Sequence, residues 1–498
     1  MAGIKSLAKD TAIYGVSSIV GRFLNWCLVP LYTITFAVAD YGVVTYVYSA
    51  VALALIILIY GMETGFFRFA NHERWHDPME VYSTSVISLG TTSTLFVLGV
   101  WAFLGPVSRA MHCGDHPEYI MMMALCVAID AFLAMPFSLL RYRKRPVRFA
   151  MLRLVSIGVN IGLNLFFILL CPWLMRVAPA AVSWWYVPSF GIGYIFVANL
   201  ASSAVNLVLM IPELRGFPYR FNLRLWREMI VYSLPLLVLG VAGIMNQTID
   251  KIIYPALAAD PSTAMEDLGI YGANYKIAIV MLMFIQAFRF AYEPFIFARN
   301  KEGGEGKHQA YRDAMKYFVL FGLLIFMGVM FYLDIIKYFI SPRYFSGLRV
   351  VPVVMMAELF FGIFFNLSLW YKLTDRTMWG AWFSLLGLAV TLGANALLVP
   401  RIGYMGCAWA ALASYATMML ASYFVGRVKH PIGYETGRIL SYFAIAAVLY
   451  VAGMYLLTPW AVVNYIVRFF ILAGFVAIII YREPLPLPGR LARMLPRR

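Results

Sequence analysis

Residues 12–36, AIYGVSSIVGRFLNWCLVPLYTITF, decide the fold because they form an apolar stretch long enough to cross a bilayer. A transmembrane helix needs about 20 apolar residues and rises about 1.5 Å per residue. Arg22 stands near the middle of this stretch, about 16 Å along the helix from Thr11. An arginine at that depth costs at least ~2.5–3.5 kcal/mol when it faces lipid. We therefore expect Arg22 to face protein or a water-filled cavity.

Helical spacing places Arg22 on a stripe of small and polar residues along one side of this helix. The stripe consists of Thr11, Gly15, Ser18, Arg22 and Asn25. Two interpretations remain open. Arg22 either pairs with a buried carboxylate such as Asp130, or it lines a path for an anionic substrate.

The composition indicates a membrane protein. Of the 498 residues, 62% are hydrophobic and only 13% are charged, whereas soluble proteins are about half apolar and a quarter charged. The net charge of +16 does not indicate nucleic-acid binding, because the basic residues are distributed over alternate loops and form no single patch. The five cysteines have no CxxC spacing, so we expect neither a disulfide framework nor a metal site. We also expect no bound cofactor.

Apolar segments of spanning length recur along the whole chain and predict an all-α, polytopic membrane protein with about 14 transmembrane helices. They cover residues 11–36, 43–66, 83–105, 119–140, 150–171, 187–211, 229–255, 271–297, 317–340, 350–371, 379–399, 404–425, 439–457 and 462–481. One set of connections, together with both chain ends, holds most of the lysines and arginines, whereas the other set holds few. Those few are Arg109, Arg176, Arg343, Arg349 and Arg401. The positive-inside rule then places both termini in the cytoplasm.

Short matching motifs recur in the same order in both halves of the chain. Asp40-Tyr41-Gly42-Val43 resembles Asp267-Leu268-Gly269-Ile270, and Gly162-Leu163-Asn164 resembles Gly393-Ala394-Asn395. Because six helices separate the motifs, the two repeats have the same orientation in the membrane, and transporters of this kind bind substrate between their halves. We predict an N-terminal lobe at 1–220, a C-terminal lobe at 221–430, two extra helices at 431–481 and a basic cytoplasmic tail at 482–498.

Several basic residues lie inside the predicted helices. Arg22, Lys251, Lys276 and Arg289 belong to the first helices of the two repeats, so we expect them to form a cationic ladder between the lobes. Arg289 and Glu293 are alternatively an i, i+4 ion pair, which would remove Arg289 from the cavity. We expect Lys337 and Arg468, near the outer interface, to extend toward water.

Other polar residues inside the helices are candidates for the cavity wall or for ion coupling. They are Asn25, Glu63, Asp130, Gln247, Asp250, Gln286, Glu293 and Glu358. Asp130 and Glu358 are the deepest carboxylates. Each is either a proton or sodium coupling site or a structural, hydrogen-bonded acid.

A cavity with several uncompensated cations suits a multiply charged anion, and arginine suits phosphate because its planar fork bonds two oxygens at once. A lipid-linked diphosphate fits this description: its head group needs a polar passage while its tail stays in lipid. An inside-negative potential also favours the outward movement of an anion, by ~2.3 kcal/mol per charge per 100 mV.

Motifs in both halves resemble Wzx-type polysaccharide flippases, whose superfamily also includes lipid II flippases and multidrug antiporters. The first half contains DTAIYG (10–15), RFLN (22–25), YGMET (60–64) and FFRF (66–69), and the second contains GIYGANYK (269–276), FRF (288–290) and EPF (293–295). The resemblance implies an alternating-access transporter in a bacterial inner membrane. It would move undecaprenyl-pyrophosphate-linked oligosaccharide to the outer leaflet for cell-surface polysaccharide, such as lipopolysaccharide. Arg22 and the basic residues of 229–255 and 271–297 would be its cavity cations.

The alternatives are a lipid II flippase, which differs only in the sugar, and a cation-coupled multidrug antiporter. A basic cavity argues against export of cationic drugs, and the short external loops argue against an enzyme. We expect lipid-linked oligosaccharide and membrane lipids as binding partners, with polysaccharide polymerase and glycosyltransferases as protein partners and no nucleic acid. Proton or sodium coupling, or the membrane potential, would drive transport.

Overall fold

The computed structural model describes residues 15, 17, 19–72, 77–302, 306–374, 376–455 and 458–483, and these contain helices and no strand. The first helix extends over Ile19–Thr35, and its last part is α2 (Val29–Thr35). The first half continues with α3 (Val38–Ile59), α4 (Met62–Ala70), α5 (Pro78–Ala102), α6 (Leu104–Ala110), α7 (Pro117–Tyr142), α8 (Pro146–Leu165), η1 (Phe166–Leu170), α9 (Cys171–Val177), α10 (Pro179–Val182), η2 (Pro188–Phe190), α11 (Gly193–Leu209) and η3 (Ile211–Leu214).

The second half repeats this succession of long helices. It contains α12 (Leu223–Leu257), α13 (Ala264–Glu302), α14 (Gly306–Phe331), α15 (Leu333–Ile336), η4 (Lys337–Phe339), η5 (Pro342–Gly347), α16 (Val350–Leu367), α17 (Leu369–Leu373), α18 (Met378–Ile402) and α19 (Tyr404–Lys429). Two further helices, α20 (Thr436–Tyr455) and α21 (Ala461–Arg482), end the described chain.

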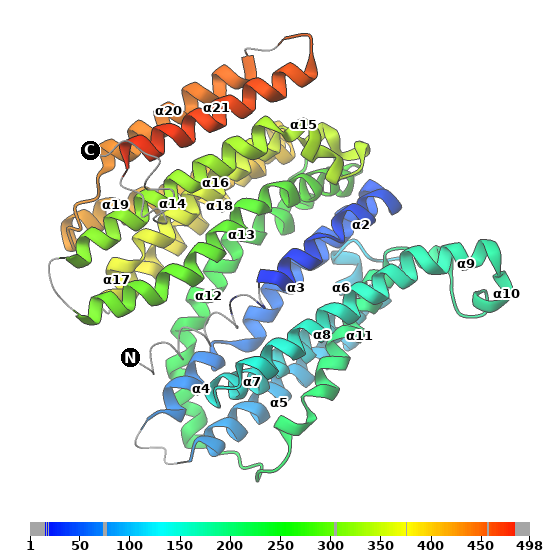
Figure 1. Ribbon diagram of the computed structural model, residues 1–498. Helices are drawn as coiled ribbons and strands as arrows, with labels where there is room; N and C mark the ends of the chain where they lie inside the picture. Colours follow the sequence, from blue (N-terminus) through cyan, green and yellow to red (C-terminus); the bar gives the residue numbers. More distant parts are fainter. Residues whose placement is uncertain are drawn as a thin grey trace.

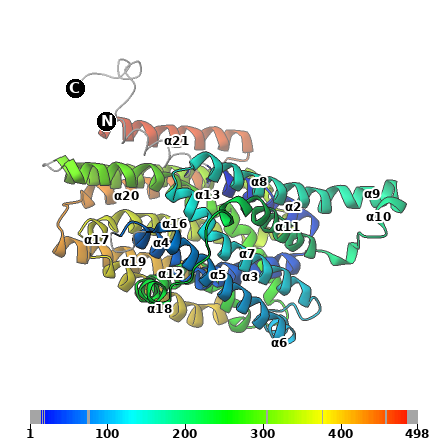
Figure 2. The same ribbon diagram turned by 90° about the horizontal axis from the view of Figure 1, so that it is seen from below.

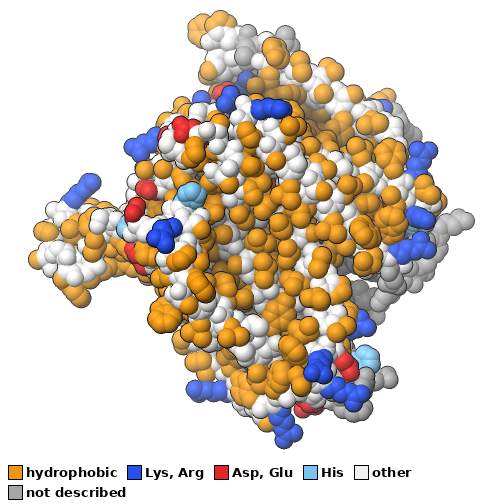
Figure 3. Space-filling model, turned by 180° about the vertical axis from the view of Figure 1, so that it is seen from behind, with side chains coloured by type: hydrophobic (Ala, Val, Ile, Leu, Met, Phe, Trp, Pro, Cys, Tyr) orange, Lys and Arg blue, Asp and Glu red, His pale blue; other side chains and the backbone are white. Residues whose placement is uncertain are grey.

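Length and composition show a multi-pass membrane protein. Within the described residues, 12 helices are long and apolar enough to cross a membrane, and two shorter apolar helices are Ile19–Thr35 and Gly193–Leu209. Figure 3 shows one face of the molecule that is covered mainly by hydrophobic side chains, with most charged side chains toward its edges. The all-α membrane fold is confirmed, while the total of fourteen spanning helices stays a prediction.

The helices pack in two groups with a pair of helices beside them (Figure 1). In the first group, α3, α5, α7, α8 and α11 contact one another, and in the second, α12, α13, α14, α16, α18 and α19 do so. The groups meet where α3 contacts α12 and α13, and where α4 contacts α12. Both α20 and α21 pack against α14, whereas α9 and α10 project beyond the other helices (Figure 2).

The two matching glycine motifs meet where the two groups touch. A Cβ on Gly42 of α3 would lie 1.8 Å from the carbonyl oxygen of Met265, and one on Gly269 of α13 would lie 2.1 Å from that of Val38. No side chain fits at such distances, so only glycine lets these backbones approach this closely. The repeat that is visible in the sequence therefore forms a backbone-to-backbone contact near the first residues of α3 and α13.

Arg468 corrects one sequence-based expectation. It does not extend toward water but is 4% exposed, and its Nη1 donates to the carbonyl oxygen of Phe331 at 2.7 Å. Its Nε donates to the carbonyl oxygen of Gly453 at 3.2 Å, and Asp334 lies 3.3 Å from Nη1. Arg468 therefore holds α21 against α14 and α20, because a buried guanidinium needs several acceptors at once.

Candidate functional site

A cavity of about 430 Å³ lies between the two groups of helices, within the size range of ligand pockets. The first helix contributes Arg22, Asn25, Trp26, Leu28, Val29 and Tyr32, and α3 contributes Tyr41, Val44, Thr45, Tyr48 and Ser49. Asn160 of α8 and Asn199 of α11 complete the first-half wall. The second half contributes Gln247, Thr248 and Lys251 of α12, and Gly272, Tyr275, Lys276, Ile279, Leu282, Met283 and Gln286 of α13. None of these residues is acidic.

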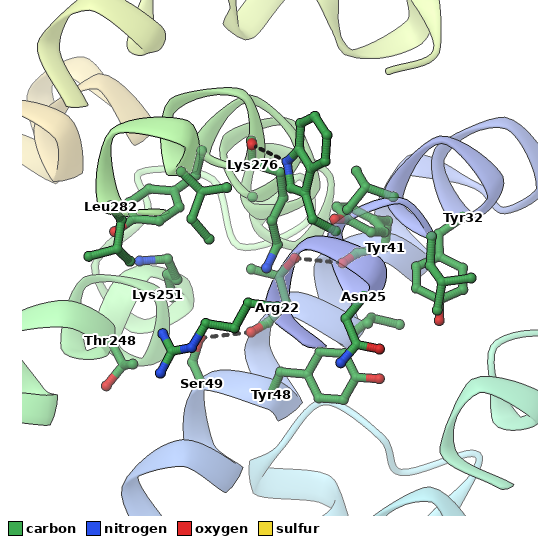
Figure 4. Close-up of a pocket in the computed structure, with 18 of the residues that line it drawn as sticks. Arg22, Asn25, Tyr32, Tyr41, Tyr48, Ser49, Thr248, Lys251, Lys276 and Leu282 are labelled. Carbon is green, nitrogen blue, oxygen red and sulfur yellow. Dashed lines mark hydrogen bonds between the residues drawn. The ribbon is translucent and has the colours of Figure 1, made fainter. Parts of the chain in front are cut away.

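Three of the four predicted ladder residues line this cavity. Figure 4 shows the side chains of Arg22, Lys251 and Lys276 reaching toward one space from three different helices. No carboxylate of the described chain lies within salt-bridge distance of Arg22 or Lys276. The cavity therefore contains two cations without an acidic partner among the described residues, and an anion is the natural counterion for them.

Lys251 differs from the other two cations because it has an acidic partner. Its Nζ lies 3.0 Å from Oδ1 of Asp250 and donates to the carbonyl oxygen of Gln247 at 3.0 Å. Tyr271 donates to Asp250 Oδ2 at 2.7 Å, and the Lys251 ammonium also lies 4.2 Å from the centroid of the Tyr275 ring. Asp250 and Lys251 thus form a buried, neutral pair, which leaves Arg22 and Lys276 as the uncompensated charges.

Glu358 lies behind the cavity wall and connects to it through Tyr275. This carboxyl is 2% exposed and accepts a hydrogen bond from the Tyr275 hydroxyl at 2.7 Å through Oε1. Its other oxygen, Oε2, is buried and has no hydrogen-bond partner. A buried polar oxygen without a partner costs free energy, and the prediction that Glu358 is a coupling site stays a prediction.

The other predicted residues have mixed placements. Asn25, Gln247 and Gln286 line the cavity as expected. Arg289 does not line it, although Gln286 is one turn away. Its guanidinium carbon lies 4.6 Å from the centroid of the Phe365 ring, and it borders a separate, small hollow. The side chain of Glu293 lies outside the described residues, so its pairing with Arg289 stays a prediction.

Two carboxylates lie away from the cavity. Glu63 accepts a hydrogen bond from Arg141 at 2.9 Å. Asp130 accepts one from Ser203 at 2.8 Å, and no salt bridge joins Asp130 to Arg22 in the described chain. The interpretation in which Asp130 neutralises Arg22 is therefore wrong, because the Asp130 carboxylate is bonded within the first group of helices, to α11.

Sequence reasoning missed the neutral part of the wall, which includes Tyr48, Asn160 and Asn199. It also missed Trp26, whose Nε1 donates to the carbonyl oxygen of Lys276 at 2.7 Å and so links the first helix to α13. One signal was present: Ser156, Asn160 and Asn164 recur every four residues within an apolar span, which marks one polar face.

Comparison with known proteins assigns this chain to a family. The family model described as "Polysaccharide biosynthesis protein" matches residues 7–300, more than half of the chain. The chain belongs to this family. No curated protein matches the sequence.

Solved structures share the fold at low sequence identity. The structure titled "Lipid II flippase MurJ, inward closed conformation" has a TM-score of 0.71 and 12% identity, and the match covers 94% of this chain and 98% of that one. An inward-facing multidrug resistance MATE family transporter of the MOP superfamily has a TM-score of 0.66 and 13% identity, with coverage of 85% and 98%. An outward-facing structure of such a transporter has a TM-score of 0.61 and 13% identity, with coverage of 86% and 98%.

These comparisons confirm the resemblance drawn from the sequence motifs. The protein is a multi-pass membrane protein of the polysaccharide biosynthesis family, and its fold is similar to that of the solved flippase and multidrug transporter structures. The fold alone does not distinguish oligosaccharide from lipid II as the substrate, because substrate choice depends on the side chains that line the cavity.

Proposed function

We propose that the protein moves an undecaprenyl-diphosphate-linked oligosaccharide from the cytoplasmic to the outer leaflet of a bacterial inner membrane by alternating access. The observation that carries this proposal is the pair of cations, Arg22 and Lys276, which line a cavity without any described acidic residue. A lipid-linked diphosphate has one negative charge on each phosphate, so two cations without acidic partners match it. Arg22 suits this role because its guanidinium bonds two phosphate oxygens at once.

The same electrostatics separate the alternatives. A multidrug antiporter exports cations, and two uncompensated positive charges would repel them. A lipid II flippase differs from our proposal only in the sugar, and the family description, which refers to polysaccharide biosynthesis, favours an oligosaccharide. The charge distribution supports cytoplasmic termini. We also propose polysaccharide polymerase and glycosyltransferases as protein partners, since they make and consume such a substrate.

We propose the membrane potential as one driving force, because it favours outward movement of an anion by ~2.3 kcal/mol per charge per 100 mV. Glu358 is the carboxylate best suited to proton coupling. Its buried Oε2 has no partner, and Tyr275, which binds its other oxygen, lines the cavity. A proton on Glu358 would thus be close to the substrate space without contacting the substrate.

The Arg22→Ala variant tests the substrate class. We expect at least tenfold slower appearance of lipid-linked oligosaccharide in the outer leaflet of proteoliposomes, since a charge-assisted hydrogen bond contributes about 1.5–3 kcal/mol. Arg401→Ala is the matched control, because Arg401 lies at the end of α18 and outside the cavity. Wild-type transport by correctly inserted Arg22→Ala protein would refute the proposal.

A further inference from the structure

Across the cavity from the lysines, five neutral side chains form one continuous chain of hydrogen bonds. Tyr32 donates to Asn164 at 2.9 Å, and Asn164 donates to Asn160 Oδ1 at 2.9 Å. Asn160 donates to Asn199 at 3.2 Å, and Asn199 donates to the Tyr48 hydroxyl at 2.7 Å. We call these five residues the amide wall. They come from α2, α8, α11 and α3, so only the folded lobe assembles them.

Internal bonds fix the orientation of the amides. Asn199 Nδ2 also donates to the carbonyl oxygen of Ile195 at 2.7 Å, so both of its N–H groups are used. Asn164, which is fully buried, also donates to the carbonyl oxygen of Asn160 at 2.8 Å. The wall is therefore preorganised, and it would not have to reorder its side chains when a ligand binds.

Some hydrogen-bonding capacity of the wall remains unused on the cavity side. Asn160 has two amide N–H groups and gives one to Asn199. The Tyr48 hydroxyl accepts from Asn199 and keeps its own proton to donate. Asn25 lines the same cavity as Tyr48, and no hydrogen bond of its side chain occurs within the described residues. Three neutral groups thus face the space that Arg22 also borders.

The chemistry of the two sides differs in a way that matches two parts of one ligand. Lys276 and Arg22 provide charge, which phosphate requires, whereas Asn25, Asn160 and Tyr48 provide neutral donors and acceptors. Sugar hydroxyl and acetamido groups are neutral, and each of them can both donate and accept hydrogen bonds. A buried sugar whose polar groups found no partner would lose binding free energy.

We infer that the amide wall, together with the neighbouring cavity residue Asn25, is the glycan subsite of the cavity, and that it binds the hydroxyl and acetamido groups of the sugar attached to the diphosphate. The inference rests on the proposed function and adds the position of the sugar. The diphosphate lies against Arg22 and Lys276, and the first sugar lies against Asn25, Asn160 and Tyr48. Selectivity for a glycosylated over a bare lipid diphosphate comes from the wall.

The Asn160→Leu variant tests this subsite. Asn164 would keep its bond to the backbone oxygen of residue 160 and would lose the bond to the side-chain oxygen, so thermal melting must show that the variant folds. We would measure the affinity of purified protein in nanodiscs for undecaprenyl diphosphate and for the same lipid with one N-acetylglucosamine. We expect about tenfold weaker binding of the glycosylated lipid and unchanged binding of the bare lipid, since one to two hydrogen bonds are lost.

Two further variants distinguish loss of the subsite from misfolding of the protein. Asn25→Leu removes an amide that makes no hydrogen bond within the described chain, and we expect a smaller loss for the same lipid only. Asn206→Leu is the matched control, because Asn206 is on α11 like Asn199 but does not line the cavity. It should bind both lipids as the wild type does.

Each outcome separates the subsite from the proposed function. Binding that is weakened equally for both lipids, or unchanged for both, in Asn160→Leu and Asn25→Leu would overturn the glycan subsite. Neither result would contradict the proposed diphosphate site. Failure of the wild-type protein to bind either lipid, or unchanged binding of bare undecaprenyl diphosphate by Arg22→Ala, would instead overturn the proposed function. In that case the inference would fall with it.

Discussion

The contact between Gly42 and the second group of helices predicts a specific change in conformation. In Gly42→Ala, the added Cβ would lie 1.8 Å from the carbonyl oxygen of Met265, whereas ordinary contacts begin at 3.4 Å. Backbone atoms cannot rotate away, so α3 and α13 must separate by about 1.6 Å. Such overpacking costs about 1–3 kcal/mol, which corresponds to a roughly 5- to 150-fold shift in a two-state equilibrium.

The cost falls only on the state in which the two glycine motifs touch. In the proposed alternating-access cycle this end opens in the other state, so we expect Gly42→Ala to favour that state. A cysteine at position 49 reports on it, because Ser49 lines the cavity and sulfur replaces oxygen with little change in shape. The exposed Cys27 would be replaced by serine, and an impermeant maleimide would be added from the side at which α3 begins.

The expected result is faster labelling of position 49 in Gly42→Ala than in the parent protein. Gly243→Ala is the matched control, since a Cβ on Gly243, in α12, would meet nothing within 4 Å. Thermal melting in detergent would show that both variants fold. An unchanged labelling rate in folded Gly42→Ala, or the same increase in Gly243→Ala, would refute the idea that this backbone contact holds the cavity closed.

Two further substitutions test the coupling site and the attachment of the last helices. Glu358→Gln keeps the hydrogen bond from Tyr275 but cannot release a proton, so proteoliposome transport should lose its response to an imposed pH gradient; a persisting response would exclude Glu358 as the coupling site. Arg468→Leu leaves two backbone carbonyls, including that of Phe331, without their donor. We expect a loss of about 2–4 kcal/mol in stability, measured by thermal melting. An unaltered melting temperature would contradict the idea that Arg468 holds α21 against α14 and α20.

Hydropathy and spacing predicted much of the architecture, because the bilayer imposes a local requirement on every span. The membrane-spanning segments and the repeated motifs were visible in the sequence, and Arg22 and Asn25 of the predicted polar stripe line the cavity, whereas Thr11 and Ser18 lie outside the described residues. The repeat motifs also identified Gly42 and Gly269 as equivalent positions. Their direct contact was not predictable, since it depends on how the two repeats face each other.

The sequence by itself determined which charges lie within apolar spans, because a span is recognised by its length and apolarity. Only the tertiary structure decided which of those charges act together. Asp250 and Lys251 are adjacent, and neighbouring residues on a helix do not normally face each other, yet the long lysine side chain returns to the carboxylate. Arg289 turns to Phe365, and the amide wall combines four separate segments. Pairing depends on distances between helices, which a one-dimensional pattern does not contain.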